Sequence, residues 1–329
     1  MTRALRRRTL ASPAVLEGVG LFTGRRVRCS LHPAEAGEGV RFVRTDLPGS
    51  PPIPATVGAI SSRPVHPAFA QIPPRHTALE AAHAGPAVPA GRLVGDPSAQ
   101  IPIVYTTEHL LATLAGLGIT DALIMLDGPE LPIGDGSAKP FAEAVALAGT
   151  RELDALAEPL TVREPVHVQS PDGRAAITAE PLHPDEQPSY RYELDYGPSA
   201  PLRPQAAEWR GSTEAFLHDV APARTFSLRA EAAQMQALGL FRSFTPRDLL
   251  VIDDAGSPID NAWRFEDESA RHKLLDLIGD LALVGRPIHA RITARRAGHA
   301  LNHAMAAALL GRDSETAGQR NRVEKGREG

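Results

Sequence analysis

Two kinds of hydrophobic spacing follow one another along this chain and predict a mixture of strands and helices. Apolar and polar residues alternate in short segments, which is the period of a half-buried strand, at 26–31, 39–44, 160–168, 175–179, 190–194 and 287–294. Apolar residues recur at helical spacing at 106–116, 140–148, around 272–281 and in an alanine-rich segment after 302. Residues 149–160 are a candidate linker, and the charged segment 312–329 lacks apolar periodicity and predicts a disordered tail.

The segment 272–281 carries the most informative pattern. At about 100° per residue, His272, Asp276 and Asp280 lie within an arc of about 80° on a helix. The other side of that helix is apolar and consists of Leu274, Leu275, Leu277, Ile278 and Leu281. A His and an Asp four residues apart can bind the same metal ion, although such a pair is more often part of a solvated face. A third ligand and a general base are needed before the pair indicates catalysis.

A second predicted helix carries two candidate functional residues in its first turn. Residues 106–116 start with two threonines that can cap the helix, continue with Glu108 and His109, and end on Gly116. The helix dipole favours a Glu at this position, and His109 can simply pack. His109 and His272 each precede a glycine by seven residues, with aliphatic residues between. This match hints at two similar α+β halves, each with a helix-borne histidine at a shared interface.

Combined, the two helices supply the core of a metal-dependent amide hydrolase. His109, His272 and Asp276 form a three-residue nitrogen and oxygen ligand set that suits catalytic zinc and leaves one position for water. Glu108, adjacent to one ligand, is the candidate general base that takes a proton from that water.

The remaining roles fall to residues elsewhere in the chain. His299 lies in a loop before the last helix and is the candidate acid that protonates a leaving amine. Asp280 can orient His299 and keep it protonated. Thr225 can donate a hydrogen bond to the oxyanion.

Composition narrows the class of protein. The chain has 329 residues, enough for two domains, and 43% hydrophobic residues, enough for well-formed cores. A net charge of −4 argues against a nucleic-acid binder, and the single cysteine, Cys29, excludes an internal disulfide framework. The basic N-terminus lacks the apolar region of a secretory signal, and no run of about 18 apolar residues predicts a membrane span. We therefore expect a soluble cytoplasmic protein.

Two further segments have simpler interpretations. The glycine-rich segment 18–24 lacks the lysine of a phosphate-binding loop and does not open a helix, so a tight hairpin is the better interpretation. Residues 61–100 are rich in Pro, Ala and His and predict a surface insertion. Its histidines, His66, His76 and His83, show no ligand spacing and are expected to be scattered surface residues.

At these residues the chain closely resembles the zinc-dependent UDP-3-O-acyl-N-acetylglucosamine deacetylase family of lipid A synthesis. The resemblance covers about residues 7–312 and rests on eight motifs in matching order, at 18–24, 44–47, 107–111, 132–137, 223–226, 264–268, 272–280 and 298–302. It implies an α+β fold of two similar domains, each a small mixed sheet packed with helices, with zinc at the domain interface. The expected bounds are 1–150 and 160–311, and Fe²⁺ is a possible alternative metal.

The resemblance also implies roles in substrate binding. Lys273 would contact the phosphate side of an acylated UDP-sugar, and Phe226 would line the glucosamine or acyl pocket. Arg163 is a candidate for the nucleotide. An inserted βαβ element, expected near 226–262, would form a passage for the acyl chain, with Leu238, Leu240 and Phe241 as possible lipid contacts. A monomer without stable membrane insertion is expected.

The chain departs from the family pattern in three places. Phe22 stands where the family usually has His, Arg242-Ser243 replaces a pair of glycines, and the insertion at 62–100 is longer than usual. Acyl-length preference is therefore the property most expected to differ. Two other functions stay open: a zinc amidase acting on another N-acetylated sugar nucleotide, and a non-catalytic binding protein on the same scaffold.

Overall fold

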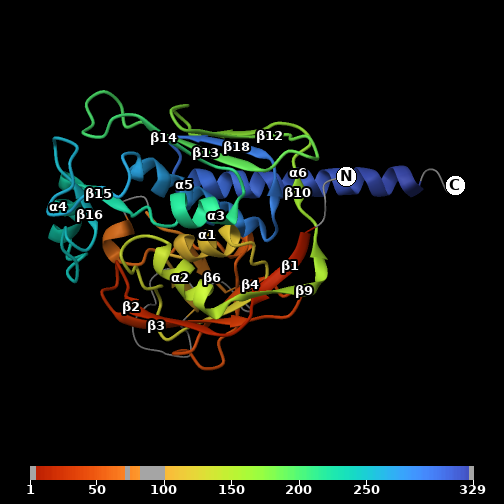
Figure 1. The fold of residues 1–329 in the computed structure, drawn as a ribbon, viewed down its shortest axis with the longest axis horizontal. Coiled ribbons are helices and arrows are strands. Elements are labelled where there is room, and N and C mark those ends of the chain that lie inside the picture. The colour runs from red at the N-terminus through yellow and green to blue at the C-terminus, as the bar shows by residue number, and fades with distance from the viewer. Residues whose placement is uncertain (1–4, 71–74, 82–100, 326–329) are drawn as a thin grey trace.

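Two five-stranded mixed sheets enclose a layer of helices (Figure 1), in a computed structural model that describes residues 5–70, 75–81 and 101–325. The first sheet has the order β2-β3-β8-β4-β5. Its strands are β2 (Ala14–Val19), β3 (Arg26–Pro33), β8 (Ala122–Leu126), β4 (Val40–Arg44) and β5 (Ile53–Pro54). The segment between β2 and β3 is a hairpin turn, as predicted, because the two strands pair antiparallel.

The first half also carries two helices and a short strand pair. These are α1 (Glu108–Gly116), α2 (Lys139–Ala148), β6 (Ala78–Glu80) and β7 (Ile103–Tyr105). In the first sheet β4 and β8 pair parallel, so the sheet is mixed rather than a simple meander. The predicted strands at 26–31 and 39–44 and the two predicted helices are confirmed.

The second half repeats this architecture with the sheet order β11-β12-β18-β13-β14. Its strands are β11 (Val166–Gln169), β12 (Ala176–Glu180), β18 (Arg291–Arg295), β13 (Ser189–Leu194) and β14 (Gln205–Trp209). Strands β13 and β18 pair parallel, although the paired residues lie 102 positions apart in the sequence, as Tyr190 and Ile292 do. The helices are α3 (Thr213–Ala215), α5 (Glu268–Leu281) and α6 (His299–Lys325). The expectation of an α+β fold with two similar halves is confirmed.

A βαβ unit lies within the range expected for an insertion, at the left of Figure 1. It comprises β15 (Phe226–Leu228), α4 (Arg229–Ala237) and β16 (Leu250–Ile252), and its two strands pair parallel. A separate apolar cluster joins this unit to the β2–β3 turn and contains Leu21, Phe22, Phe69, Ile133, Met235, Leu240 and Leu249. The unit is therefore anchored to the first half of the chain, although its sequence lies in the second.

One prediction about an irregular segment is wrong. The candidate linker at 149–160 contains β9 (Thr150–Ala157), which pairs antiparallel with β1 (Leu5–Leu10). Its apolar residues are too sparse to mark a strand by themselves, and pairing with β1 supplies the missing constraint. Helix α6 extends to Lys325, through a segment that contains no proline to end it. Two short strands, β10 (Leu160–Thr161) and β17 (Ile288–His289), pair nearby.

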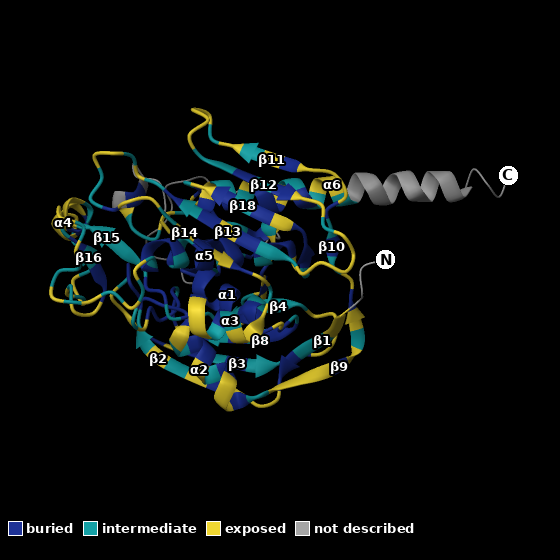
Figure 2. Ribbon diagram, turned by 45° about the horizontal axis from the view of Figure 1, so that its top comes forward, coloured by how far each residue is buried: buried dark blue, intermediate teal, exposed yellow. Residues whose placement is uncertain are grey.

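Helix α5 lies at the centre of the molecule between the two sheets, and most of it is buried (Figure 2). The five apolar residues predicted to face the core are buried, namely Leu274, Leu275, Leu277, Ile278 and Leu281. The opposite stripe is not solvated, because His272, Asp276 and Asp280 are at most 3% exposed. Burial on both sides excludes the interpretation of this stripe as an ordinary solvent-facing one.

The close approach of α5 to α1 depends on one glycine. A Cβ atom at Gly279 would lie 2.1 Å from the backbone oxygen of Glu108, well inside van der Waals contact. A second glycine, Gly116 at the end of α1, meets the ring of Phe216 in the same way, at 2.3 Å. The contact at Gly279 brings the first turn of α1 directly against the last turn of α5.

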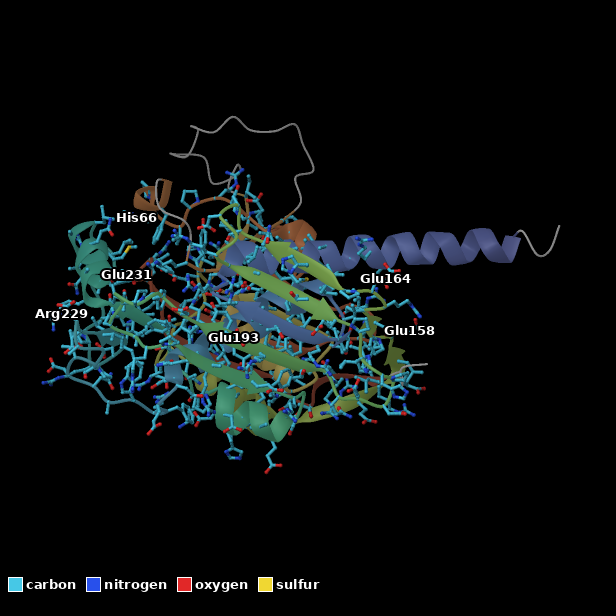
Figure 3. All side chains as sticks on the ribbon, turned by 90° about the horizontal axis from the view of Figure 1, so that it is seen from above. His66, Glu158, Glu164, Glu193, Arg229 and Glu231 are labelled. Atoms are coloured by element: carbon cyan, nitrogen blue, oxygen red, sulfur yellow. The ribbon has the colours of Figure 1, made fainter. Side chains whose placement is uncertain are left out.

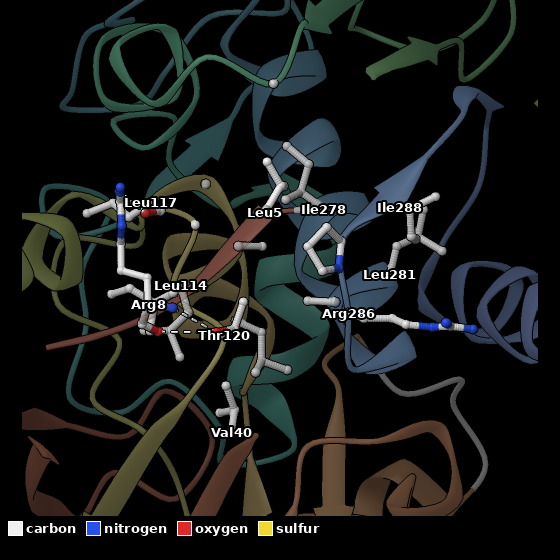
Figure 4. Close-up of a pocket in the computed structure, with 18 of the residues that line it drawn as sticks. Leu5, Arg8, Val40, Leu114, Leu117, Thr120, Ile278, Leu281, Arg286 and Ile288 are labelled. Atoms are coloured by element: carbon white, nitrogen blue, oxygen red, sulfur yellow. Dashed lines mark hydrogen bonds between the residues drawn. The ribbon is translucent and has the colours of Figure 1, made fainter. Parts of the chain in front are cut away.

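A cavity of about 370 Å³ lies between the two halves at the C-terminal end of α1 (Figure 4). Residues from both halves line it, including Val40, Leu114, Leu117, Ile278 and Ile288. Because Glu108 and His109 are in the first turn of α1, the cavity and the candidate site lie at opposite ends of this helix. Among the described residues, no helix is long and apolar enough to cross a membrane.

We expect Gly279→Ala to destabilise the fold by about 1–3 kcal/mol, because the added methyl group overlaps backbone that cannot rotate away. Gly311→Ala is the matched control, since Gly311 also lies within a helix but has open space around the Cβ position. That change should be neutral or stabilise by up to about 1 kcal/mol. Urea unfolding of both variants measures the difference. Equal midpoints for the two variants would contradict the tight packing at Gly279.

Candidate metal centre and active site

Three buried side chains from α1 and α5 form a group that can hold a metal ion. His109, His272 and Asp276 each offer one ligand atom, and these atoms lie within 4.8 Å of one another. The Nε2 atoms of His109 and His272 are 3.8 and 3.4 Å from Asp276 Oδ1, so all three point to one spot. The two imidazole rings are nearly perpendicular, at 88°. This is the ligand set predicted from the sequence, assembled from both halves of the chain.

The environment keeps these side chains in the protonation states that bind metals. Burial lowers the pKa of His109 to about 3 and also lowers the pKa of His272, so both imidazoles are neutral. His272 Nδ1 is 3.1 Å from the carbonyl oxygen of Ala223, which suits an Nδ1–H donor and leaves Nε2 free for an ion. Burial opposes ionisation of Asp276, but Lys273 and His272 outweigh it and lower its pKa. Two neutral imidazoles and a carboxylate fit a divalent transition metal ion.

Glu108 lies beside this group in the first turn of α1 and is 3% exposed. Burial raises the pKa of its carboxyl group to about 8, despite the nearby charge of His299. A carboxylate with a pKa near neutrality can both accept and release a proton at physiological pH, which suits a general base. One of its oxygens, Oε2, accepts a hydrogen bond from the backbone N–H of Thr77, which fixes its orientation.

His299 and Asp280 form the second proton-transferring pair. His299 Nδ1 is 2.8 Å from Asp280 Oδ2, and both side chains are buried. Burial disfavours a charged imidazole, but the charge and hydrogen bond of Asp280 outweigh it and raise the pKa of His299 to about 9. His299 Nε2 lies 4.0 Å from Asp276 Oδ2, on the side of the candidate ligands. An imidazole favoured in its charged form therefore lies close enough to Glu108 for the two groups to interact electrostatically.

Three residues that sequence reasoning did not select complete this network. The Thr77 hydroxyl donates a hydrogen bond to Asp280 Oδ1, and the Asn302 side-chain amide donates one to Asp280 Oδ2 at 2.8 Å. His303 Nε2 lies 2.9 Å from the Thr77 hydroxyl oxygen. His299, Asn302 and His303 share helical i, i+3, i+4 spacing, a signal present in the sequence. Thr77 lies in the proline- and alanine-rich stretch, where no pattern marks it.

Thr225 is positioned by a buried ion pair next to it. The Arg224 guanidinium forms two hydrogen bonds with the Glu268 carboxylate, at 2.7 and 3.0 Å, and Glu268 also accepts the backbone N–H of Arg224. Glu268 is the first residue of α5, so the pair ties the strand start at 223–226 to the helix that carries His272. The Thr225 backbone N–H donates to Gly136 O at 2.7 Å, which ties the same segment to the first half.

The three predicted substrate-binding residues lie in different parts of the structure. Lys273 donates to Asp276 Oδ2 at 2.7 Å and thus lies next to the ligand group. Phe226 lines a hollow of about 70 Å³ between β15, α4 and β16, together with Thr225 and residues of the βαβ unit. Arg163 is exposed after β10, and its neighbour Glu164 lies at the end of the molecule opposite Arg229 of α4 (Figure 3). A contact of Arg163 with the nucleotide stays a prediction.

The prediction that His76 is a scattered surface residue is wrong. His76 is 3% exposed and packs against the rings of Phe22, Phe69 and Tyr105, at centroid distances of 4.7, 6.0 and 5.6 Å. Burial lowers its pKa to about 3, so it is a neutral ring among aromatic ones. Phe22, the departure from the family pattern, therefore takes part in an aromatic cluster next to the site. His83 lies outside the described residues.

The start of α1 is held differently from the predicted threonine cap. The Thr107 hydroxyl donates to the carbonyl of Thr77 and makes no capping bond to the helix. Thr106 has a φ angle of 61°, a left-handed conformation that is unfavourable for a β-branched residue. Its hydroxyl donates to the buried Glu130, which also accepts the backbone N–H of Phe22. The strained backbone directly before Glu108 is thus held by surrounding hydrogen bonds.

Comparison with known proteins places this arrangement in a family. A family model described as UDP-3-O-acyl N-acetylglycosamine deacetylase matches residues 7–76 and 93–311. The UDP-3-O-acyl-N-acetylglucosamine deacetylase of Myxococcus xanthus is 35% identical over 306 residues, covering 90% of this chain and 83% of the relative. The enzymes of the same name from Geobacter sp. and Thermosynechococcus vestitus are each 36% identical, covering 92% and 93% of this chain and 88% and 94% of their own lengths. This chain belongs to the UDP-3-O-acyl-N-acetylglucosamine deacetylase family.

Proposed function

We propose that this protein hydrolyses the acetamide of UDP-3-O-(3-hydroxyacyl)-N-acetylglucosamine to the free amine and acetate, in the synthesis of lipid A. One observation carries the proposal: a member of this deacetylase family brings a metal-ligand set, a buried carboxylate and a histidine–aspartate pair together at one centre. These are the parts that hydrolysis of an amide requires. The other two functions considered above have no observation in their favour.

We propose that His109, His272 and Asp276 bind a zinc ion. Bound zinc would polarise the amide carbonyl and lower the pKa of water, and Fe²⁺ could occupy the same ligand set. Glu108 would take the proton from the attacking water, a role supported by its raised pKa and by its place next to His109.

The histidine–aspartate pair would complete the reaction. His299 would donate its proton to the leaving amine nitrogen, because the amine is a poor leaving group unless it is protonated. Asp280 would stabilise the imidazolium form through the 2.8 Å hydrogen bond to Nδ1. Thr225 would donate a hydrogen bond from its hydroxyl group to the oxyanion, from a segment fixed by the Arg224–Glu268 pair.

The substrate would extend from this centre in two directions. We propose that Lys273 contacts the phosphate side and that Phe226 and the βαβ unit contact the glucosamine and acyl groups, with Leu240 and Phe241 towards the lipid. The hollow at Phe226 supports this assignment. A monomeric, cytoplasmic enzyme with domains at 1–150 and 160–311 stays part of the proposal.

Acetate release from UDP-3-O-(3-hydroxyacyl)-N-acetylglucosamine tests the function directly. We expect release by the zinc-loaded protein, loss of release after treatment with a chelator, and recovery on addition of one equivalent of zinc. The reason is that the amide carbonyl is not activated without the ion. Release that persists after complete removal of metal contradicts the mechanism. Activity on UDP-N-acetylglucosamine but not on its acylated form contradicts the substrate.

Two substitutions separate the base from the metal ligands. Glu108→Gln keeps the shape of the side chain, so we expect one bound metal ion per chain and a kcat lower by about 10²–10⁴-fold. His272→Ala removes a ligand, so both metal and activity should be lost. His167→Ala is the control, because His167 is exposed on β11 and bonds only to Thr178 among the contacts found for it. Metal analysis and kcat together measure the outcome, and near-normal turnover of Glu108→Gln would remove Glu108 from the role of base.

A further inference from the structure

Thr77 contacts the candidate base, Glu108, and also Asp280, the carboxylate that orients the candidate acid His299. Its backbone N–H donates to Glu108 Oε2 at 2.9 Å, and its side-chain hydroxyl donates to Asp280 Oδ1 at 2.5 Å. Thr77 and Asp280 are each 0% exposed, so water does not compete for these hydrogen bonds. Glu108 belongs to the first half of the chain and Asp280 to the second. One residue therefore fixes two carboxylates that come from different halves.

The protons of this network can be assigned by counting donors and acceptors. The Thr77 hydroxyl has a single proton, and an ionised Asp280 only accepts, so that proton lies between Thr77 Oγ1 and Asp280 Oδ1. His303 Nε2, 2.9 Å from the same oxygen, must then be the donor in its own contact with Thr77. This assignment gives His303 an Nε2–H group and makes the chain of donors run from His303 through Thr77 to Asp280.

The other oxygen of Asp280 is occupied as well. Oδ2 accepts from His299 Nδ1 and from Asn302, each at 2.8 Å. Both oxygens of a fully buried carboxylate are thus held, and the orientation of the carboxylate fixes which nitrogen of His299 faces the ligand group. Without the Thr77 hydroxyl, Oδ1 would keep only the weaker contact with His303 Nε2 at 3.4 Å. The carboxylate could then turn, and His299 would turn with it.

We propose that Thr77 is a positioning residue for the deacetylation and that His303 supports it, by fixing Asp280 and thereby the orientation of His299. The inference rests on the function proposed above, since it assigns Thr77 to the reaction of that site. Thr77 acts through Asp280 and Glu108 and does not itself transfer a proton to substrate. The backbone contact to Glu108 is independent of the side chain, so substitutions at Thr77 test the hydroxyl alone.

Two variants separate the hydroxyl group from the shape of the side chain. Thr77→Val keeps the branched shape and removes the hydroxyl, whereas Thr77→Ser keeps the hydroxyl and removes one methyl group. We expect Thr77→Val to lower kcat by about 10–100-fold, the range found when an outer partner of a site is removed, with KM and bound metal unchanged. Thr77→Ser should retain kcat within a few-fold of the parent protein.

Thr9→Val is the matched control. Thr9 is also 0% exposed and also loses a hydrogen bond, because its Oγ1 accepts the backbone N–H of Ala34. It lies in β1 and should lower stability without lowering kcat. A kcat of Thr77→Val equal to that of the parent protein overturns the proposal. So does an equal loss of kcat in Thr77→Ser, or a loss of bound metal in Thr77→Val.

A spectroscopic measurement keeps this test separate from the test of the function. Buried imidazole N–H protons give slowly exchanging proton resonances far downfield, and the network predicts one for His299 Nδ1–H and one for His303 Nε2–H. Proton NMR of zinc-loaded, ¹⁵N-histidine-labelled protein should show both in the parent and in Thr77→Ser. In Thr77→Val the His303 resonance should disappear and the His299 resonance should shift. If the parent protein releases no acetate, the proposed function fails while this spectrum still decides the network; unchanged resonances in Thr77→Val overturn it.

Discussion

The contact between the backbone of Glu108 and Gly279 is the constraint on which the candidate site depends. It allows α1 and α5 to approach without an intervening side chain, next to His109 on α1 and about one turn from Asp276 on α5. His109 then faces His272 and Asp276 across the boundary between the halves. A wider separation would leave each half with one or two ligands and no complete set. The two halves therefore pack against each other at the candidate site, and a change in this packing would change the geometry of the ligand set.

Burial then decides the charges in the site. Removal of water raises the pKa of Glu108 and lowers those of His109 and His272, whereas Asp280 reverses the effect of burial for His299. One centre therefore holds a carboxyl group whose ionisation burial disfavours and an imidazole whose charged form a neighbouring carboxylate favours. The cost of burying so many polar groups is offset because most of them bond to one another, as the four contacts of Asp280 illustrate.

Much of this arrangement could be predicted from the sequence because it follows from local spacing. The ligand pair on α5 shares one helix face, and the Glu108–His109 pair opens another helix, so their residues were found without knowledge of the fold. Thr77 could not be found this way, because its role arises from contacts with residues 31 and 203 positions away. His76 was misassigned for a related reason: its burial depends on three aromatic rings that no periodicity brings together. The strand at 150–157 was missed because only its pairing with β1 defines it.

The pairing of β1 with β9 has a consequence for how the protein is made. Leu10 is the partner of Thr150, so the pairing of β1 with β9 cannot form until 140 further residues have been synthesised. At about 5–20 residues per second, that interval is roughly 7–28 seconds. During this time Leu10, which is fully buried in the folded protein, lacks the strand that pairs with it. Strand β9, which lies between the two halves in the sequence, therefore completes the first half when it pairs with β1.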